Sequence, residues 1–355
     1  MRSGRLRNYL PTLALCAAAG CGAARAVAQH SVEDGLTVEM NQIIAAHHGK
    51  VALYARQLDS QHEVEIDSAK PVQTASDIKL AILYDAMVEV REGRAKWDER
   101  LTLKPGEAVG GSGMLHFFDT PLSLTLKDVL TMMVVVSDNT ATNMAIDRFG
   151  IDAINARAES VGLANTHLYK KVFKPAEGPL PADYATFGLG KSTPREMANL
   201  MELIGRCELR RQPGTPAGEM NFAPMDADDK AVCDVALGML KNQFYRETVP
   251  RYLESADVTT TGGVAIASKT GSLDAVRADV AIVMGKTGPM VLAIFTYDNA
   301  DHGWTVDNEG EVTIAKLAKA IVTAWSPGGL DGKLLVPGLG VADGASATGT
   351  GAVKK

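Results

Sequence analysis

Ser76 and Lys79 are the first two residues whose types and spacing could do chemistry together. They stand three positions apart at the start of a predicted amphipathic helix, so their side chains share one face and the lysine amine can reach the serine hydroxyl. Such an amine can activate the hydroxyl as a nucleophile, and the unpaired N–H groups at a helix start favour an oxyanion beside it. The pattern is weak alone, because a helix-capping serine followed by a solvated lysine has the same sequence.

A second polar group, Ser137-Asp138-Asn139, lies on a tight turn between two apolar helical patterns. Ser137 could pass a proton to a leaving nitrogen, and Asn139 could present its amide to a substrate carbonyl. A plain capping turn prefers the same residue types and is the alternative interpretation.

A third group, Lys269-Thr270-Gly271-Ser272, ends a predicted strand. Lys269 would place a positive charge at the edge of a cleft, and Gly271 would let the backbone approach a ligand closely. Ser272 could offer its N–H as a second oxyanion donor. Alone, the segment also fits an ordinary polar strand end.

Together and in this order, the three groups resemble the signature of class A-like serine β-lactamases and penicillin-binding proteins. The resemblance extends over about residues 31–325, and the segment 192–198 is similar to the helix start that follows the family's Ω-loop. It implies that a β-lactam carbonyl acylates Ser76, with Lys79 as activator and Ser137 as proton relay.

The resemblance also implies ligands for the substrate. Asn139 would bind its amide, Lys269 and Thr270 would bind its carboxylate, and the N–H groups of Ser76 and Ser272 would form the oxyanion hole. Arg277 is a further candidate for the carboxylate, although a surface arginine fits its position almost equally well.

The Ω-loop departs from the family pattern. It keeps Glu177 and Leu180 at the expected spacing but has Pro181 where the family has asparagine. We expect Glu177 to activate the deacylating water less well than in the family, because a proline ring can neither donate to that water nor accept from it. In the alternative, Glu177 is a solvated loop acid, and Asp183 or Lys79 serves in its place. Asp77 is a further departure, since the family often has a small polar residue there.

The order of elements predicts how these groups are positioned. A helix over 32–48 and strands at 51–58 and 63–66 come first, helical patterns fill 75–253, and strands return before a closing helix over 311–325. This order predicts an α/β (α+β) fold like that of β-lactamases, in which a discontinuous antiparallel sheet flanked by helices receives an inserted all-helical subdomain. We expect a signal peptide at 1–28, an α/β subdomain at 29–68 and 264–326, a helical subdomain with the Ω-loop at 69–263, and a disordered tail at 327–355.

The two termini and the composition limit where the protein acts and on what. Basic residues, a short apolar stretch and Ala26-Val27-Ala28 predict a signal peptide cleaved after Ala28, and hence a periplasmic or secreted protein. The apolar stretch is too short to span a membrane. Cys21 is a weaker candidate for a lipid anchor. With 36 Lys plus Arg against 42 Asp plus Glu and a net charge of −6, nucleic acid is not an expected partner.

Cys207 and Cys233 remain after cleavage of the signal, and export permits them to pair. A disulfide would close a polar, Pro/Gly-rich excursion and stabilise it by roughly 3–4 kcal/mol on a loop-entropy model; two buried thiols are the alternative. The seven histidines show no metal-binding pattern, so no metal or cofactor is expected.

The leading hypothesis is a monomeric, exported serine hydrolase that opens β-lactams. A D-alanyl-D-alanine carboxypeptidase or related peptidoglycan enzyme, and a penicillin-binding sink or sensor that stalls after acylation, need the same three motifs. A competent deacylating carboxylate distinguishes these possibilities.

Overall fold

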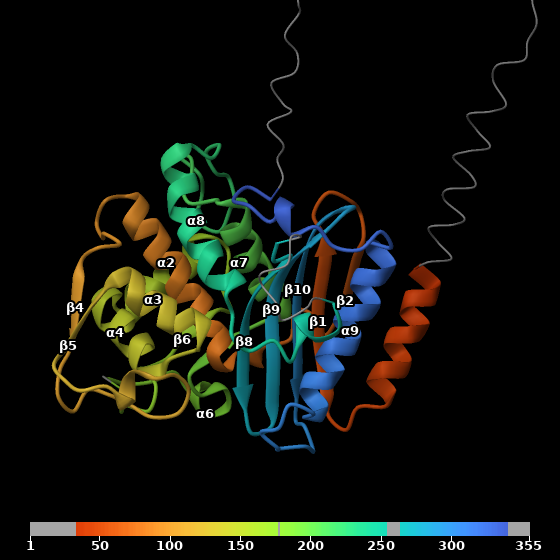
Figure 1. Cartoon of the computed structure of the whole chain (residues 1–355), viewed down its shortest axis with the longest axis horizontal. Helices are drawn as coiled ribbons and strands as arrows, with labels where there is room; N and C mark the ends of the chain where they lie inside the picture. Colours follow the sequence, from red (N-terminus) through yellow and green to blue (C-terminus); the bar gives the residue numbers. More distant parts are fainter. Residues whose placement is uncertain (1–32, 177, 254–262, 340–355) are drawn as a thin grey trace, which may run out of the picture.

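A five-stranded antiparallel sheet forms one layer of the molecule. The computed structural model describes residues 33–176, 178–253 and 263–339. The strands follow the order β2-β1-β10-β9-β8, so two strands from the start of the chain pair with three from its end (Figure 1). Their bounds are β1 (Lys50–Gln57), β2 (Glu63–Ile66), β8 (Ile266–Leu273), β9 (Val276–Gly285) and β10 (Gly288–Tyr297). The predicted discontinuous sheet is thus confirmed, and β8 lies at its edge.

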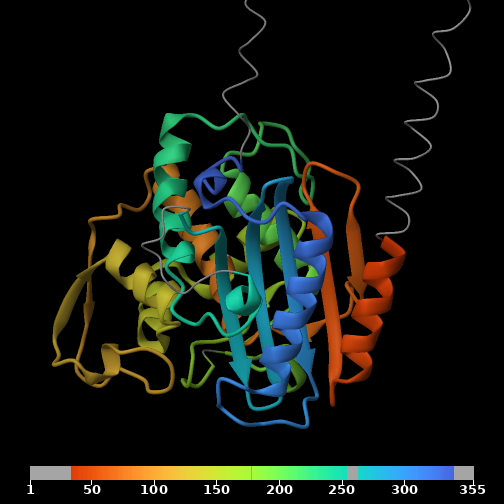
Figure 2. The same cartoon turned by 45° about the vertical axis from the view of Figure 1, so that its right-hand side comes forward.

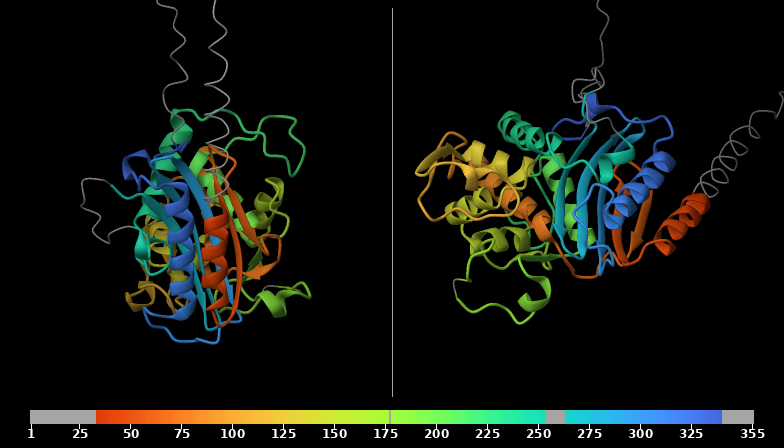
Figure 3. Two further views of the ribbon diagram at one scale, coloured as in Figure 1. Left: turned by 90° about the vertical axis from the view of Figure 1, so that its right-hand side faces the viewer. Right: turned by 60° about the horizontal axis from the view of Figure 1, so that its bottom comes forward.

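Helices cover both faces of this sheet because its side chains alternate. In β9, Ala281 and Val283 belong to one apolar cluster, and Val280 and Ile282 belong to another. The first cluster packs under α9 (Glu309–Trp325), the helix over residues 33–45 and the short helix η3 (Val249–Tyr252). Figures 2 and 3 show α9 and the N-terminal helix side by side on this face. The second cluster extends into the inserted layer of helices.

The inserted layer surrounds α2 (Lys79–Arg91), which is buried from Lys79 to Val88. The sequence predicted an amphipathic helix here, but α2 contacts other helices on several sides and is therefore a core helix. Those helices are α3 (Leu126–Val135), α4 (Asn139–Phe149), α5 (Ile151–Ser160), α7 (Pro194–Arg206) and α8 (Ala227–Lys241). Of these, α7 also packs on β1, β9 and β10, so it joins the two layers.

Short elements complete the inserted layer. Two small sheets lie within the segment that the sequence predicted as all-helical, with strand orders β3-β7-β6 and β4-β5. Strands of two to four residues are too short to leave a period-two pattern, which is why the sequence did not reveal them. Their bounds, with those of the short helices, are β3 (Val72–Gln73), β4 (Arg100–Leu103), β5 (Leu122–Thr125), β6 (His167–Leu168), β7 (Gly190–Ser192), η1 (Ala75–Ile78), η2 (Leu115–Phe117) and α6 (Tyr184–Phe187).

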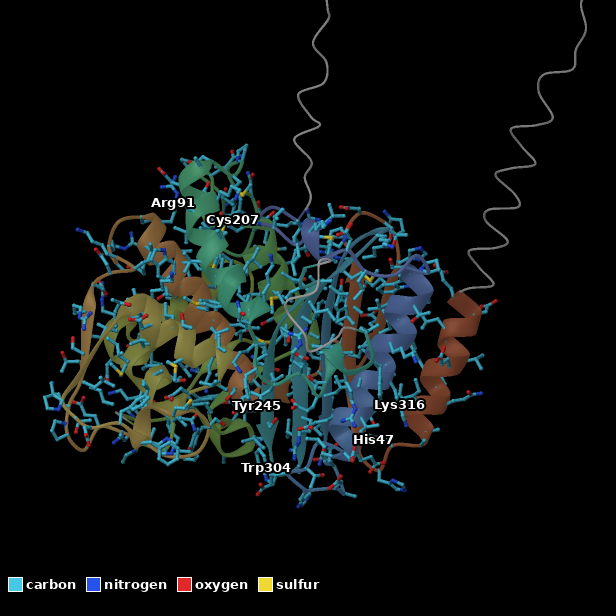
Figure 4. All side chains as sticks on the ribbon, in the orientation of Figure 1. His47, Arg91, Cys207, Tyr245, Trp304 and Lys316 are labelled. Carbon is cyan, nitrogen blue, oxygen red and sulfur yellow. A yellow bond between two sulfur atoms is a disulfide. The ribbon has the colours of Figure 1, made fainter. Side chains whose placement is uncertain are left out.

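Cys207 and Cys233 are joined by a disulfide, with their Cα atoms 5.9 Å apart. Cys207 ends α7 in a left-handed conformation, and Cys233 lies inside α8. Both side chains are buried, and Figure 4 labels Cys207 at the junction of these two helices. The bond closes the polar excursion between them.

The C-terminal segment corrects one prediction. The sequence predicted a disordered tail over 327–355, yet residues 327–339 fold back onto the body through η4 (Gly332–Leu334). Leu335 and Leu339 are buried, and the N–H of Gly338 donates to Gly205 O at 2.9 Å. A few well-placed apolar side chains fix this segment despite its polar composition. Residues 340–355 and the predicted signal peptide lie outside the described residues.

The helices of the described residues are not built as membrane spans. None of them combines the length and the apolar character that crossing a bilayer requires.

Candidate active site

Ser76 lies at the junction of the two layers. It belongs to the short helix η1, which packs against β8 and leads directly into α2. The N–H of Asp77 donates to Thr74 O at 2.9 Å, and Ala75, immediately before the serine, has a positive φ of 47°. Such unfavourable backbone conformations collect at functional sites. Ser76 is half-buried and is the second residue of η1, within one residue of the predicted helix start.

Lys79 is fully buried and connects α2 to the turn before α4. Its Nζ donates to Ser137 O at 2.6 Å, to Ser137 Oγ at 3.1 Å and to Asn139 Oδ1 at 3.1 Å. Burial lowers its pKa well below the usual value, and the positive charge of Lys269 lowers it further. The alternative of a solvated lysine is therefore wrong. A buried amine with a depressed pKa can lose its proton and act as a base.

Asp138 holds the Ser137 turn in place. Its Oδ1 accepts from Ala141 N at 2.8 Å and caps α4, while its Oδ2 accepts from the N–H groups of Met114 and Leu115 at 2.6 and 2.8 Å. Capping is thus the role of Asp138, as the alternative interpretation had it. Its two neighbours in the turn are left to face Lys79.

Asn139 has an oriented side-chain amide. Its Oδ1 accepts from Lys79, and its Nδ2 donates one proton to Gly110 O at 3.1 Å. An amide nitrogen has two N–H groups, so one remains for a substrate carbonyl. Sequence reasoning missed the loop that orients this amide. Its glycine-rich run was the available signal, because a Cβ atom at Gly111 would lie 2.7 Å from Asn139 Nδ2.

Lys269, on strand β8 of the sheet, contacts Ser137, the serine that Lys79 also contacts. Its Nζ donates to Ser137 Oγ at 3.0 Å and to Thr270 O at 2.7 Å. The side chain is fully buried, and burial lowers its pKa to about 8 against the opposing charges of Asp77 and Asp279. Lys269 therefore keeps a positive charge near neutral pH and can bind an anionic group.

Gly271 and Ser272 lie on the outer strand of the sheet. A Cβ atom at Gly271 would come within 2.6 Å of Thr74 O, so only glycine lets η1 pack this closely. The close approach predicted for a ligand is made here by the chain's own η1. Ser272 is half-buried, and as part of an edge strand it offers backbone groups that β9 does not fully use. Thr270 is nearly buried beside them.

Arg277 is not a surface arginine. It is fully buried opposite Ser272, and its guanidinium donates to Leu273 O, to Val276 O at 2.9 Å and to Gly303 O at 2.6 Å. Its Nε lies 3.2 Å from a Glu311 oxygen, and its Cζ lies 4.7 Å from the ring centre of Trp304, labelled in Figure 4. Most of its donors thus support the β8–β9 turn and the loop before α9.

Glu177 lies outside the described residues. In the loop before it, the Asn143 side chain binds the backbone of Val172. Val172 N donates to Asn143 Oδ1 at 2.8 Å, and Asn143 Nδ2 donates to Val172 O at 3.0 Å. Asp183, the alternative deacylating base, is paired with Lys191 at 2.6 Å, and this hydrogen bond lowers its pKa. Among the described residues, no group of three or more potential ligands could hold a metal ion.

Fold and site together define a protein of the serine β-lactamase and penicillin-binding fold. A family model described as the Beta-lactamase enzyme family matches residues 35–217 and 225–325. The chain belongs to this family. The predicted fold class and family are both confirmed.

Solved structures show how far the similarity extends. A β-lactamase from Sphaerobacter thermophilus is 24% identical with a TM-score of 0.64, and the match covers 81% of this chain and 96% of that one. PBP-A is 25% identical with a TM-score of 0.62, over 82% and 95% of the two chains. A β-lactamase from Xanthomonas campestris pv. campestris is 15% identical with a TM-score of 0.63, over 82% and 98%. No curated protein sequence matches this chain.

Proposed function

We propose that this family member is a serine hydrolase that opens β-lactams through an acyl-enzyme at Ser76. The observation that carries the proposal is the convergence of three separate motifs on one atom, since Lys79 and Lys269 both donate to Ser137 Oγ. A capping serine, a polar turn and a polar strand end would have no reason to meet in this way.

Acylation begins when neutral Lys79 accepts the Ser76 proton and Ser76 Oγ attacks the lactam carbonyl carbon. The carbonyl oxygen becomes an oxyanion, which the N–H groups of Ser76 and Ser272 stabilise. The C–N bond of the ring then breaks. Ser137 gives its proton to the leaving nitrogen and recovers one from Lys79, so the amine is neutral again.

Substrate binding uses the remaining donors of the site. Lys269 carries the positive charge for a substrate carboxylate, with Thr270 beside it. Asn139 offers its free N–H to the amide carbonyl of the substrate. Deacylation needs a base for water, and Glu177 is our candidate for that role.

Slow deacylation is the alternative function, and Pro181 favours it. Pro181 replaces the asparagine that would help to order the deacylating water. A solved structure of a PBP-A mutant is described as an acyl-enzyme complex with penicillin G, and this chain's similarity to it supports a long-lived adduct. In that case the protein acts on D-Ala-D-Ala peptides, or it holds penicillin as a sink or sensor.

Export is a further part of the proposal. The basic and apolar residues before Ala28 support cleavage there and a periplasmic or secreted location. The mass and the N-terminal sequence of the protein recovered from a producing bacterium test this. A mature chain that begins at Gln29 supports export of a soluble form, one that begins with lipidated Cys21 supports anchoring, and an uncleaved chain contradicts both.

One paired experiment tests the activity. Purified protein is given a chromogenic cephalosporin and, separately, a peptide ending in D-Ala-D-Ala, while steady-state turnover and intact mass are followed together. Fast cephalosporin turnover supports the β-lactamase, and turnover of the peptide alone supports the carboxypeptidase. A persistent adduct of one ligand mass supports the sink or sensor. Labelling that survives Ser76→Ala would contradict all three.

A further inference from the structure

Phe173 is an exposed aromatic residue beside the amide that would bind the substrate, and the proposed reaction gives it no role. It is 70% exposed, although Val172 immediately before it is buried. Its backbone has a positive φ of 53°, a conformation that a bulky residue seldom adopts. Such a conformation persists only where the surrounding structure imposes it.

Helix α4 holds the backbone next to Phe173. Val172 N donates to Asn143 Oδ1 at 2.8 Å, and Asn143 Nδ2 donates to Val172 O at 3.0 Å. Asn143 is buried and lies four residues after Asn139 in α4, so the two side chains share one face of the helix. That face therefore positions both the amide for the substrate and the backbone that carries the phenylalanine.

Gly111 leaves the space between the ring and the amide open. A Cβ atom at this position would lie 2.7 Å from Asn139 Nδ2 and 3.0 Å from Phe173 Cε2, so both groups border the same small volume. Any side chain at residue 111 would fill it. Asn139 Nδ2 donates one proton to Gly110 O, and its second N–H is the one that a substrate carbonyl can use.

We propose that Phe173 is a specificity-determining residue that packs against the acyl side chain of the substrate, and so selects β-lactams whose acylamino group is aromatic or otherwise bulky and apolar. In such a substrate the acyl side chain is bonded to the carbon of the carbonyl that Asn139 binds, so it begins beside the ring. Contact removes apolar surface of both groups from water, and two aromatic rings gain further from their packing. This inference deepens the proposed function and rests on it.

The test compares two penicillins that differ only in this group. Benzylpenicillin carries a phenyl ring, and its acetyl analogue has the same amide but a methyl group in place of the benzyl group. The rate constant of Ser76 acylation is measured for each compound by intact mass, and the ratio of the two constants is the discrimination. Phe173→Ala should lower this ratio by about 3- to 10-fold, because only benzylpenicillin loses a ring contact. Damage to the site itself would lower both constants together.

Two further variants and a control separate the effect of the ring from that of the backbone. Phe173→Asn removes the ring but tolerates a positive φ, so it should lower the ratio as alanine does, and it serves if the alanine variant does not fold. Phe173→Tyr keeps the ring and should keep the ratio within about twofold of the parent protein. Tyr252→Ala is the matched control, because Tyr252 is also an exposed aromatic residue but lies on η3, on the other face of the sheet. It should not change the ratio.

An unchanged ratio in the folded Phe173→Ala and Phe173→Asn variants would overturn the inference. Faster labelling of these variants by benzylpenicillin would also overturn it, because the ring would then obstruct the acyl group instead of binding it. If neither penicillin labels the parent protein, the proposed function has failed instead, so the two failures are distinguishable.

Discussion

Lys79 and Lys269 donate hydrogen bonds to the same atom, Ser137 Oγ, at 3.1 and 3.0 Å. With both donors in place, the hydroxyl proton of Ser137 must point elsewhere, which in the proposed mechanism leaves it for the leaving nitrogen. The two lysines thus orient the hydroxyl of Ser137, the proposed proton relay, in addition to giving the site positive charge. Four predictions concern this site and the fold that supports it.

Catalytic efficiency toward a β-lactam that bears a carboxylate should follow a bell-shaped pH profile. Lys79 must be neutral, so the rate rises as pH passes its depressed pKa. Lys269 must be charged, so the rate falls as pH rises through about 8, where burial has brought its pKa. Lys269→Arg keeps a charge at every accessible pH and should remove the alkaline fall. Steady-state kinetics with a chromogenic cephalosporin measure both limbs, and an unaltered alkaline limb in Lys269→Arg would assign it to another group.

Lys269→Ala should lower catalytic efficiency by one to two decades. The change removes a charge-assisted contact to the substrate carboxylate, which is worth about 1.5–3 kcal/mol in the transition state. Lys230→Ala is the control, because that lysine is exposed on α8 and forms an ion pair with Asp234 on the same helix. The control should stay within about twofold of the parent protein. Equal efficiencies in the two variants would place the substrate carboxylate away from β8.

Glu177→Ala should let the Ser76 adduct accumulate while acylation remains measurable. Loss of the general base slows deacylation by roughly 10²- to 10⁴-fold. Time-resolved intact mass after a single addition of penicillin follows both steps. Asp183→Ala is the comparison, because Asp183 is the alternative base and is paired with Lys191. If the adduct persists in the Asp183 variant and decays normally in the Glu177 variant, the roles are reversed.

Leu335→Ala should lower the free energy of unfolding by about 2–4 kcal/mol, because it leaves a cavity in the apolar core. Its neighbour supplies the control, since Leu334 is 45% exposed whereas Leu335 is 0% exposed. Leu334→Ala should change stability by less than about 0.5 kcal/mol. Urea unfolding followed by fluorescence gives both values. Similar stabilities would mean that residues 327–339 add little to the fold.

The sequence by itself determined the order of the elements and the identity of the chemical groups. The helical and alternating patterns are local properties, so β1, β2 and α9 are found close to where they were predicted, and helices fill most of the predicted helical segment. The three motifs also carry their residue types and spacing in the sequence itself. Their order was sufficient to indicate the family, which the family model then confirmed.

Only the tertiary structure decided which groups meet and which are held apart. Contacts at Ser137 Oγ depend on the register of β8 against β9 and on the burial of α2, and neither is encoded in local periodicity. Arg277 could be read as a surface residue because its partners Gly303 and Glu311 lie in a later loop and helix. Asp77 looked like a polar substitution beside the nucleophile. Its complete burial emerged only when η1 packed against the sheet at Gly271, because burial depends on contacts between segments that are far apart in the sequence.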